Sequence, residues 1–105
     1  MDAVSVDTGT DGSLTVVLRG EIDFTNAAPA LDVIRAAVDR VAPTSIRVAM
    51  PEVTFLDSSG IGVLVHVMRL AEDLGVPFRV SDPAPKVYEQ LRMSGLTEAF
   101  GLVED

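Results

Sequence analysis

Residues 53–65 read Val53-Thr54-Phe55-Leu56-Asp57-Ser58-Ser59-Gly60-Ile61-Gly62-Val63-Leu64-Val65. β-type residues come first, a short polar turn follows, and apolar residues then recur at helical spacing, which predicts a strand end, a turn and a helix start. An oxygen side chain at Asp57, Ser58 or Ser59 can accept from the unpaired N–H groups of the first helical turn. A negative charge there also meets the positive end of the helix dipole. The turn therefore either only caps a helix or also suits a phosphoserine.

The chain before this stretch predicts a hairpin followed by a strand-helix-strand unit. Residues 4–18 contain two β-type runs separated by turn formers, which favours an antiparallel pair. Residues 46–50 alternate apolar and polar side chains and predict a third strand, paired in parallel through a right-handed crossover. Between them we expect a helix that Thr25 or Asn26 caps and that has an inward stripe of Leu31, Ile34, Val38 and Val41.

The chain after the central stretch predicts two more helices and at least one more strand. We expect a central helix from about Ser59 to Leu74 and a strand over residues 78–80. A third helix follows residues 82–85, and residues 99–103 are a candidate for a short last strand. The expected fold is α/β, a mixed sheet of four to five strands with about three α-helices, and residues 1–105 form one domain.

Composition narrows the possible functions. The 105 residues contain no cysteine, which excludes thiolate sites and disulfides. The net charge of −8 opposes binding to nucleic acid or anionic lipid. Charged residues interrupt every apolar run, and the N-terminus has neither a basic start nor an apolar core. We therefore expect a cytoplasmic protein that acts neither at a membrane nor on nucleic acid.

The central helix has a wider apolar arc than one packing face needs. Gly62, His66, Arg69 and Asp73 fall on one narrow stripe, and the remaining positions are mostly apolar. Residues at the edge of the arc, Val63 and Val67 first, are therefore expected to be exposed or to lie under another element. Exposed, they would form a docking surface beside the polar turn. Covered, they would pack beneath the third helix or the end of the chain.

The sequence gives no reason to expect an enzyme. His66 is the only histidine, and it follows Ser58 by eight residues, about 12 Å along a helix axis, too far to act as its base. Nucleotide-binding glycine loops, Gly-x-Ser-x-Gly and metal-ligand spacings are absent from the sequence. Glu21 and Asp23 could meet Asp57 at one end of the sheet, but strand-end carboxylates are usually turn and capping groups. We expect no catalytic residue, cofactor or metal.

Three segments together resemble a known family. Gly20-Glu21-Ile22-Asp23, residues 53–62 and Met93-Ser94-Gly95-Leu96 are similar to the bacterial anti-sigma factor antagonists. These are single STAS domains that include the sporulation and general-stress anti-anti-sigma proteins. The resemblance covers nearly the whole chain and implies a regulator of transcription.

The resemblance implies partner switching. Unphosphorylated family members bind an anti-sigma factor, which is also a serine kinase, and so release a sigma factor. The kinase supplies ATP and Mg²⁺ and phosphorylates a serine that corresponds to Ser58, with Ser59 as second choice, and a metal-dependent serine phosphatase reverses the step. Free family members are commonly monomeric. The partner-binding surface is expected to comprise Glu21, Asp23, Asp57, Ser59, Gly60, Gly62, Val63, His66 and Val67.

Two other functions remain open at this point. A STAS-like subunit of a lipid- or solute-transport assembly would dock an ATPase or permease with the same helix edge, without phosphorylation. A hydrolase that uses Ser58 or Ser59 is the second alternative, and the missing base argues against it.

Overall fold

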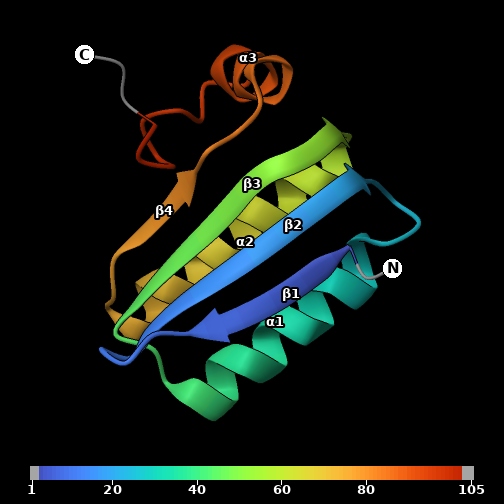
Figure 1. Cartoon of the computed structure of the whole chain (residues 1–105). Helices are drawn as coiled ribbons and strands as arrows, with labels where there is room; N and C mark the ends of the chain where they lie inside the picture. Colours follow the sequence, from blue (N-terminus) through green and yellow to red (C-terminus); the bar gives the residue numbers. More distant parts are fainter. Residues whose placement is uncertain (1–2, 103–105) are drawn as a thin grey trace.

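A computed structural model describes residues 3–102 of the chain (Figure 1). Its described elements, in chain order, are β1 (Val4–Thr8), β2 (Ser13–Ile22), α1 (Ala27–Val41), β3 (Ser45–Leu56), α2 (Ser58–Leu74), β4 (Phe78–Ser81) and α3 (Pro85–Met93). The order of strands and helices predicted as far as α3 is confirmed, and so is the α/β class.

The four strands of the described region form one mixed sheet in the order β1-β2-β3-β4. β1 and β2 pair antiparallel as a hairpin, whereas β3 is parallel to β2 and β4 is parallel to β3. β3 continues past Pro51 to Leu56, further than the expected strand over residues 46–50. The pairing with β2 shifts around Pro51, where β3 has one residue more than its neighbour. A bulge of this kind accommodates a proline, because proline has no N–H to give to the sheet.

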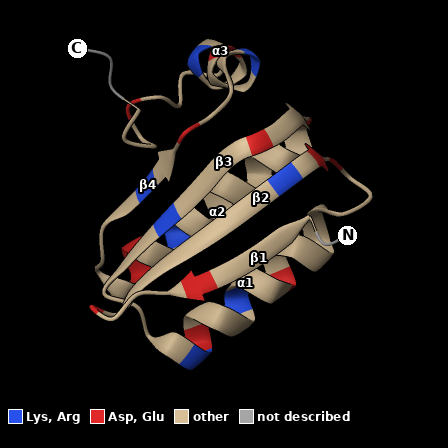
Figure 2. Cartoon of the chain, viewed as in Figure 1, with Lys and Arg blue, Asp and Glu red and all other residues tan. Residues whose placement is uncertain are grey.

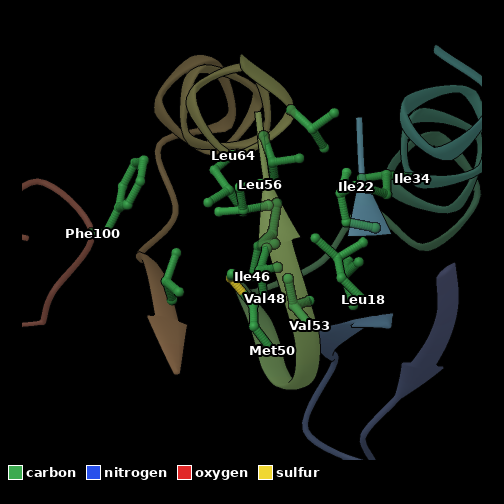
Figure 3. Close-up of a cluster of buried hydrophobic side chains, with 14 of the residues drawn as sticks. Leu18, Ile22, Ile34, Ile46, Val48, Met50, Val53, Leu56, Leu64 and Phe100 are labelled. Atoms are coloured by element: carbon green, nitrogen blue, oxygen red, sulfur yellow. The ribbon is translucent and has the colours of Figure 1, made fainter. Parts of the chain in front are cut away.

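The hydrophobic core lies between the sheet and the layer formed by α1 and α2 (Figures 1 and 3). Alternate residues of β2 and β3 point into it, as the period of a strand requires. On α1 the predicted Ile34 and Val38 are buried, while Leu31 is only partly buried. The largest fully buried side chains include Leu14, Leu18, Ile22, Ile34, Ile46, Met50, Leu56, Leu64, Leu91 and Phe100.

Of the two alternatives for Val63 and Val67, exposure on a docking surface is wrong, and both side chains lie under other elements. Their side chains are 3% and 0% exposed and belong to the core cluster. The reason is the number of neighbours around α2, which packs against α1 as well as against β3 and β4. A helix that contacts both a sheet and a second helix buries a wider arc than one that contacts a single surface.

The expected last strand over residues 99–103 is also wrong as far as residue 102, and Val103 lies outside the described residues. Residues 97–101 form consecutive turns instead. Phe100 is fully buried and meets Phe78 edge to face, with ring centroids 5.9 Å apart. Its carbonyl oxygen accepts from Val80 N at 2.8 Å, so the turn supplies a single hydrogen bond to the edge of β4.

The helix ends follow ordinary capping chemistry. Asp57 caps α2, and Gly75 ends it in the left-handed conformation with a φ of 70°. Asn26 holds the cap position of α1, as one of the two predicted residues, but its side chain makes no capping bond. Within residues 3–102, no helix combines the length and the apolar character that crossing a membrane requires.

Candidate functional site

Asp57 ties the start of α2 to the loop between β2 and α1. One carboxylate oxygen accepts from Gly60 N and the other from Phe24 N, each at 3.0 Å. Its backbone N–H also donates to Ile22 O at 3.3 Å. Because both oxygens serve backbone donors from different elements, this carboxylate fixes the geometry of the turn as well as capping the helix.

The loop that receives Asp57 is itself held by local hydrogen bonds. Asn26 Nδ2 donates to Glu21 O at 2.8 Å, and Asn26 Oδ1 accepts from Asp23 N at 3.0 Å. The Asp23 carboxylate accepts from the hydroxyl and the backbone N–H of Thr25. These hydrogen bonds, of which the one from the Thr25 hydroxyl has the largest effect, lower the pKa of Asp23 below its ordinary value of 3.8. The side chain therefore carries a negative charge at neutral pH.

The two serines of the turn differ in exposure. Ser58 begins α2 and is exposed, whereas Ser59 is partly buried. Neither hydroxyl makes a hydrogen bond to any residue in the part of the chain that the structure describes. A modifying enzyme could therefore reach the Ser58 oxygen without breaking an internal contact.

The two glycines of the turn have different surroundings. A Cβ on Gly60 would lie 2.4 Å from Ile22 O and 3.0 Å from Leu56 Cδ2, so the glycine lets α2 approach the sheet closely. A Cβ on Gly62 would meet nothing within 4 Å. Glycine is roughly 0.5–1 kcal/mol less favourable than alanine inside a helix, and no contact within the described chain compensates for it at this position.

Large apolar side chains are exposed near the same end of the sheet. Phe24, in the loop bonded to Asp57, is 79% exposed, and Phe55, near the end of β3, is 45% exposed. Met93, the last residue of α3, is 78% exposed, and α3 is tied to the end of β3 by Gln90 Nε2, which donates to Leu56 O at 2.9 Å. None of these three residues is among those predicted from the sequence to bind a partner. An aromatic residue among turn-forming residues at 23–26 was the available signal for Phe24.

The structure brings most of the predicted acidic and serine residues together. Glu21 lies opposite Phe55 in the β2–β3 pairing, and Asp23 precedes the loop residue that Asp57 holds. A shallow hollow of about 330 Å³ beside Glu21 and Asp23 extends to Arg19 and Asn26.

The remaining predicted partner-binding residues divide into two sets. Gly62 is exposed and His66 partly buried on the outer stripe of α2 that begins at Ser58. Gly60, Val63 and Val67 are buried and cannot contact a partner directly, which corrects their proposed place on the binding surface. Within residues 3–102, no group of three or more histidine, aspartate or glutamate side chains is arranged to hold a metal ion.

Comparison with known proteins identifies the family of this chain. The sequence model of the STAS domain family matches residues 5–105 of the chain. An anti-sigma F factor antagonist of Paenibacillus polymyxa is 33% identical over 94 residues, which are 90% of this chain and 80% of that protein.

Solved structures of two antagonists share the fold. An anti-sigma factor antagonist from Mycobacterium paratuberculosis is 25% identical with a TM-score of 0.79, over 92% of this chain and 80% of that one. The Bacillus cell fate determinant SpoIIAA, in its phosphorylated form, is 26% identical with a TM-score of 0.72, over 91% of this chain and 86% of that one.

The same fold also occurs outside this group. A sulfate transporter family protein from Wolinella succinogenes matches with a TM-score of 0.73 at 20% identity, over 90% of this chain and 75% of that one. The fold alone therefore does not decide the function. The chain belongs to the STAS domain family, and within it resembles the single-domain anti-sigma factor antagonists.

Proposed function

We propose that this protein is an anti-sigma factor antagonist that binds an anti-sigma factor in its unphosphorylated form and is switched off by phosphorylation of Ser58. One observation carries the switch: the Ser58 hydroxyl is exposed and makes no hydrogen bond to residues 3–102, beside the Asp57 cap of α2. The 33% identity to an anti-sigma F factor antagonist supports the binding role. The kinase, with its own ATP and Mg²⁺, and the phosphatase are partners of this proposal.

The energetics of phosphorylation favour a change in binding over a change in fold. A phosphate on Ser58 adds about −1.5 to −2 charge, and the N-terminus of α2 offsets part of the repulsion from Asp57. Modification of Ser58 breaks no hydrogen bond within the described part of the chain, so we expect the fold to persist. A partner that covers the site must instead desolvate the new charge. A penalty of roughly 3 kcal/mol would weaken binding more than a hundredfold.

The proposed docking surface surrounds Ser58 and differs from the one expected from sequence. Phe24 is its largest exposed apolar side chain, and large aromatic residues often dominate binding energy. Gly62, one helical turn beyond Ser58, presents bare backbone that allows another chain to approach closely. Glu21 and Asp23 make the rim acidic, which suits a basic partner surface.

Phosphopeptide mass spectrometry on the protein purified from its host, in growth and under stress, tests the switch. Tryptic cleavage after Arg47 and Arg69 isolates both serines in one peptide, and fragmentation assigns the phosphate to Ser58 or Ser59. We expect phosphate on Ser58 with an occupancy that changes between conditions, loss of the signal in Ser58→Ala, and no loss in Ser59→Ala. Absence of phosphate in every condition would contradict the proposal.

The docking surface has a separate test. Anti-sigma factors of the host with a kinase domain are titrated with the wild type, Ser58→Glu, Phe24→Ala and, as a surface control, Arg35→Ala. We expect Ser58→Glu and Phe24→Ala to weaken binding at least tenfold without lowering the midpoint of thermal unfolding, and Arg35→Ala to bind as the wild type does. Equal affinity of all four proteins would remove Phe24 and Ser58 from the interface.

A docking subunit of a transport assembly is the second candidate, because the fold is shared with a sulfate transporter family protein. That role needs no phosphorylation. A host strain with Ser58→Ala distinguishes the two, since a locked antagonist would release the sigma factor constitutively, whereas a transport subunit would behave as the wild type.

A further inference from the structure

A row of polar side chains crosses the sheet on the face opposite α1 and α2. Leu14, Ile46 and Val80 are buried in the core, so the intervening residues of their strands point to the other face. The pairing places Thr15 opposite Arg47 and Arg47 opposite Arg79, one on each of β2, β3 and β4. Figure 2 shows basic segments on the neighbouring strands β3 and β4.

This row borders a groove of about 280 Å³ at the N-terminal ends of the three strands. Its polar lining residues are Ser13, Thr15, Ser45, Arg47 and Arg79. The side chains of Thr15 and Ser45 make no hydrogen bond to any residue from 3 to 102, so both hydroxyls can donate to a ligand. The volume is below that of cavities which hold drug-sized compounds, so a small ligand fits best.

The charge in this groove is unusual for so acidic a chain. The protein has a net charge of −8, yet two of its eight basic residues are neighbours here. Within residues 3–102, no carboxylate lies within 4.0 Å of either Arg47 or Arg79. Like charges opposite each other destabilise a sheet, and a bound anion would relieve that repulsion. Arg47 Nη1 donates to Ser81 Oγ at 3.5 Å, so this guanidinium lies toward β4 at a position two residues beyond Arg79.

Two acidic residues lie beside the row, on the side of β1. Asp7, on β1, pairs with Thr15 and is therefore two strands from Arg47. The Asp11 carboxylate already accepts from the backbone N–H and the hydroxyl of Ser13. Neither acid stands between the two arginines.

We propose that this groove binds a small ligand with a phosphate group, held by Arg47 and Arg79 together with the hydroxyls of Thr15 and Ser45. Guanidinium groups match the oxygens of a phosphate with paired hydrogen bonds, and two of them balance a dianion. The site is separate from the proposed switch. Nine strand residues of about 3.3 Å each place Arg47 roughly 30 Å from Leu56, beside Ser58.

The experiment follows amide chemical shifts of the ¹⁵N-labelled full chain during titration with inorganic phosphate, at constant ionic strength because salt screens exposed charges. We expect saturable shifts that centre on Thr15, Arg47 and Arg79. Arg47→Gln and Arg79→Gln should each weaken binding about tenfold, since a hydrogen bond to a charged group is worth that much. Arg69→Gln, on the exposed stripe of α2, is the matched control and should bind as the wild type does.

Several results would overturn the proposal. Shifts that grow linearly without saturation, or that are equal in Arg47→Gln, Arg79→Gln and Arg69→Gln, would show that no site exists. Tighter binding of malonate than of phosphate would exclude the assigned ligand class. If a glutamine variant unfolds, Arg47→Lys and Arg79→Lys, which keep the positive charge, replace it in the titration. Phosphate binding as tight as that of the wild type in both lysine variants would show that the guanidinium groups have no role. None of these readouts involves Ser58 or an anti-sigma factor.

Discussion

Replacing Gly60 by alanine tests the packing that positions the proposed switch. The new Cβ would lie 2.4 Å from Ile22 O, about 1 Å inside ordinary contact, and 3.0 Å from Leu56 Cδ2. Leu56 can rotate away, but Ile22 O belongs to the backbone of β2 and also accepts from Asp57 N. The helix must therefore move away from the strand, and the hydrogen bond of Asp57 lengthens with it.

The expected loss of stability is the difference between two effects. Inserting one methyl group into a tightly packed position typically costs about 1–3 kcal/mol, and more where the neighbour is backbone. Alanine recovers about 1 kcal/mol of helix propensity relative to glycine. We expect Gly60→Ala to lower the free energy of unfolding by about 2 kcal/mol net. For a domain of 105 residues this corresponds to a fall of roughly 10 °C in the melting midpoint.

Gly62→Ala is the matched control, because it makes the same chemical change two residues further along the same helix. A Cβ there meets nothing within 4 Å, so alanine should raise the free energy of unfolding by about 0.5–1 kcal/mol. Urea unfolding followed by circular dichroism measures both variants. The reasoning is refuted if Gly60→Ala is as stable as the wild type, or if both variants change stability in the same direction.

Three further predictions concern the cap, the loop and the core. Asp57→Ala should cost about 2 kcal/mol in thermal unfolding, since it removes a helix cap and leaves Phe24 N without its acceptor; a loss below 0.5 kcal/mol would contradict the capping geometry. The pKa of Asp23 is lowered, so its contribution to stability is present above pH 3.8 and is lost as the pH falls through the folded value. Thr25→Val should raise that pKa in an NMR titration and should reduce the loss of stability below pH 4. Val67→Ala should cost about 2 to 3 kcal/mol because Val67 is fully buried, whereas Val33→Ala, at 44% exposure, should cost under 1 kcal/mol; equal costs would contradict the burial of Val67.

Local signals in the sequence were sufficient for most of the fold. The turn between the first strands and the helix α1 depend on neighbouring residues and form as predicted, and the cap of α2 is Asp57, one of the three predicted candidates. The structure of residues 97–101 was harder to predict, because a short apolar run fits a strand as well as a turn. Phe100 stays out of a strand because its ring fills a space beside Phe78, which only the folded sheet creates.

The candidate site was predictable in its centre and not in its surroundings. The turn predicts a cap at Asp57, Ser58 or Ser59, and the resemblance to the family selects Ser58 as the acceptor. The bond from Asp57 to Phe24 N joins residues that lie 33 positions apart, so no local pattern contains it. The valines of α2 were misplaced because the hydrophobic arc of a helix shows how much surface is apolar but not how many elements surround it.

The rigidity of the turn restricts how a modification of Ser58 could act. Both oxygens of Asp57 hold backbone donors, and Gly60 seats α2 directly against Ile22 O. Switches that order or melt a segment need a segment of low local stability. The start of α2 is held from two sides, so a phosphate there would act by its charge and its volume at the surface. The partner would then distinguish the phosphorylated from the unphosphorylated form by the residues that it places against Ser58. The exposed Phe24 and the bare backbone of Gly62 flank that position and would set how closely the partner approaches it.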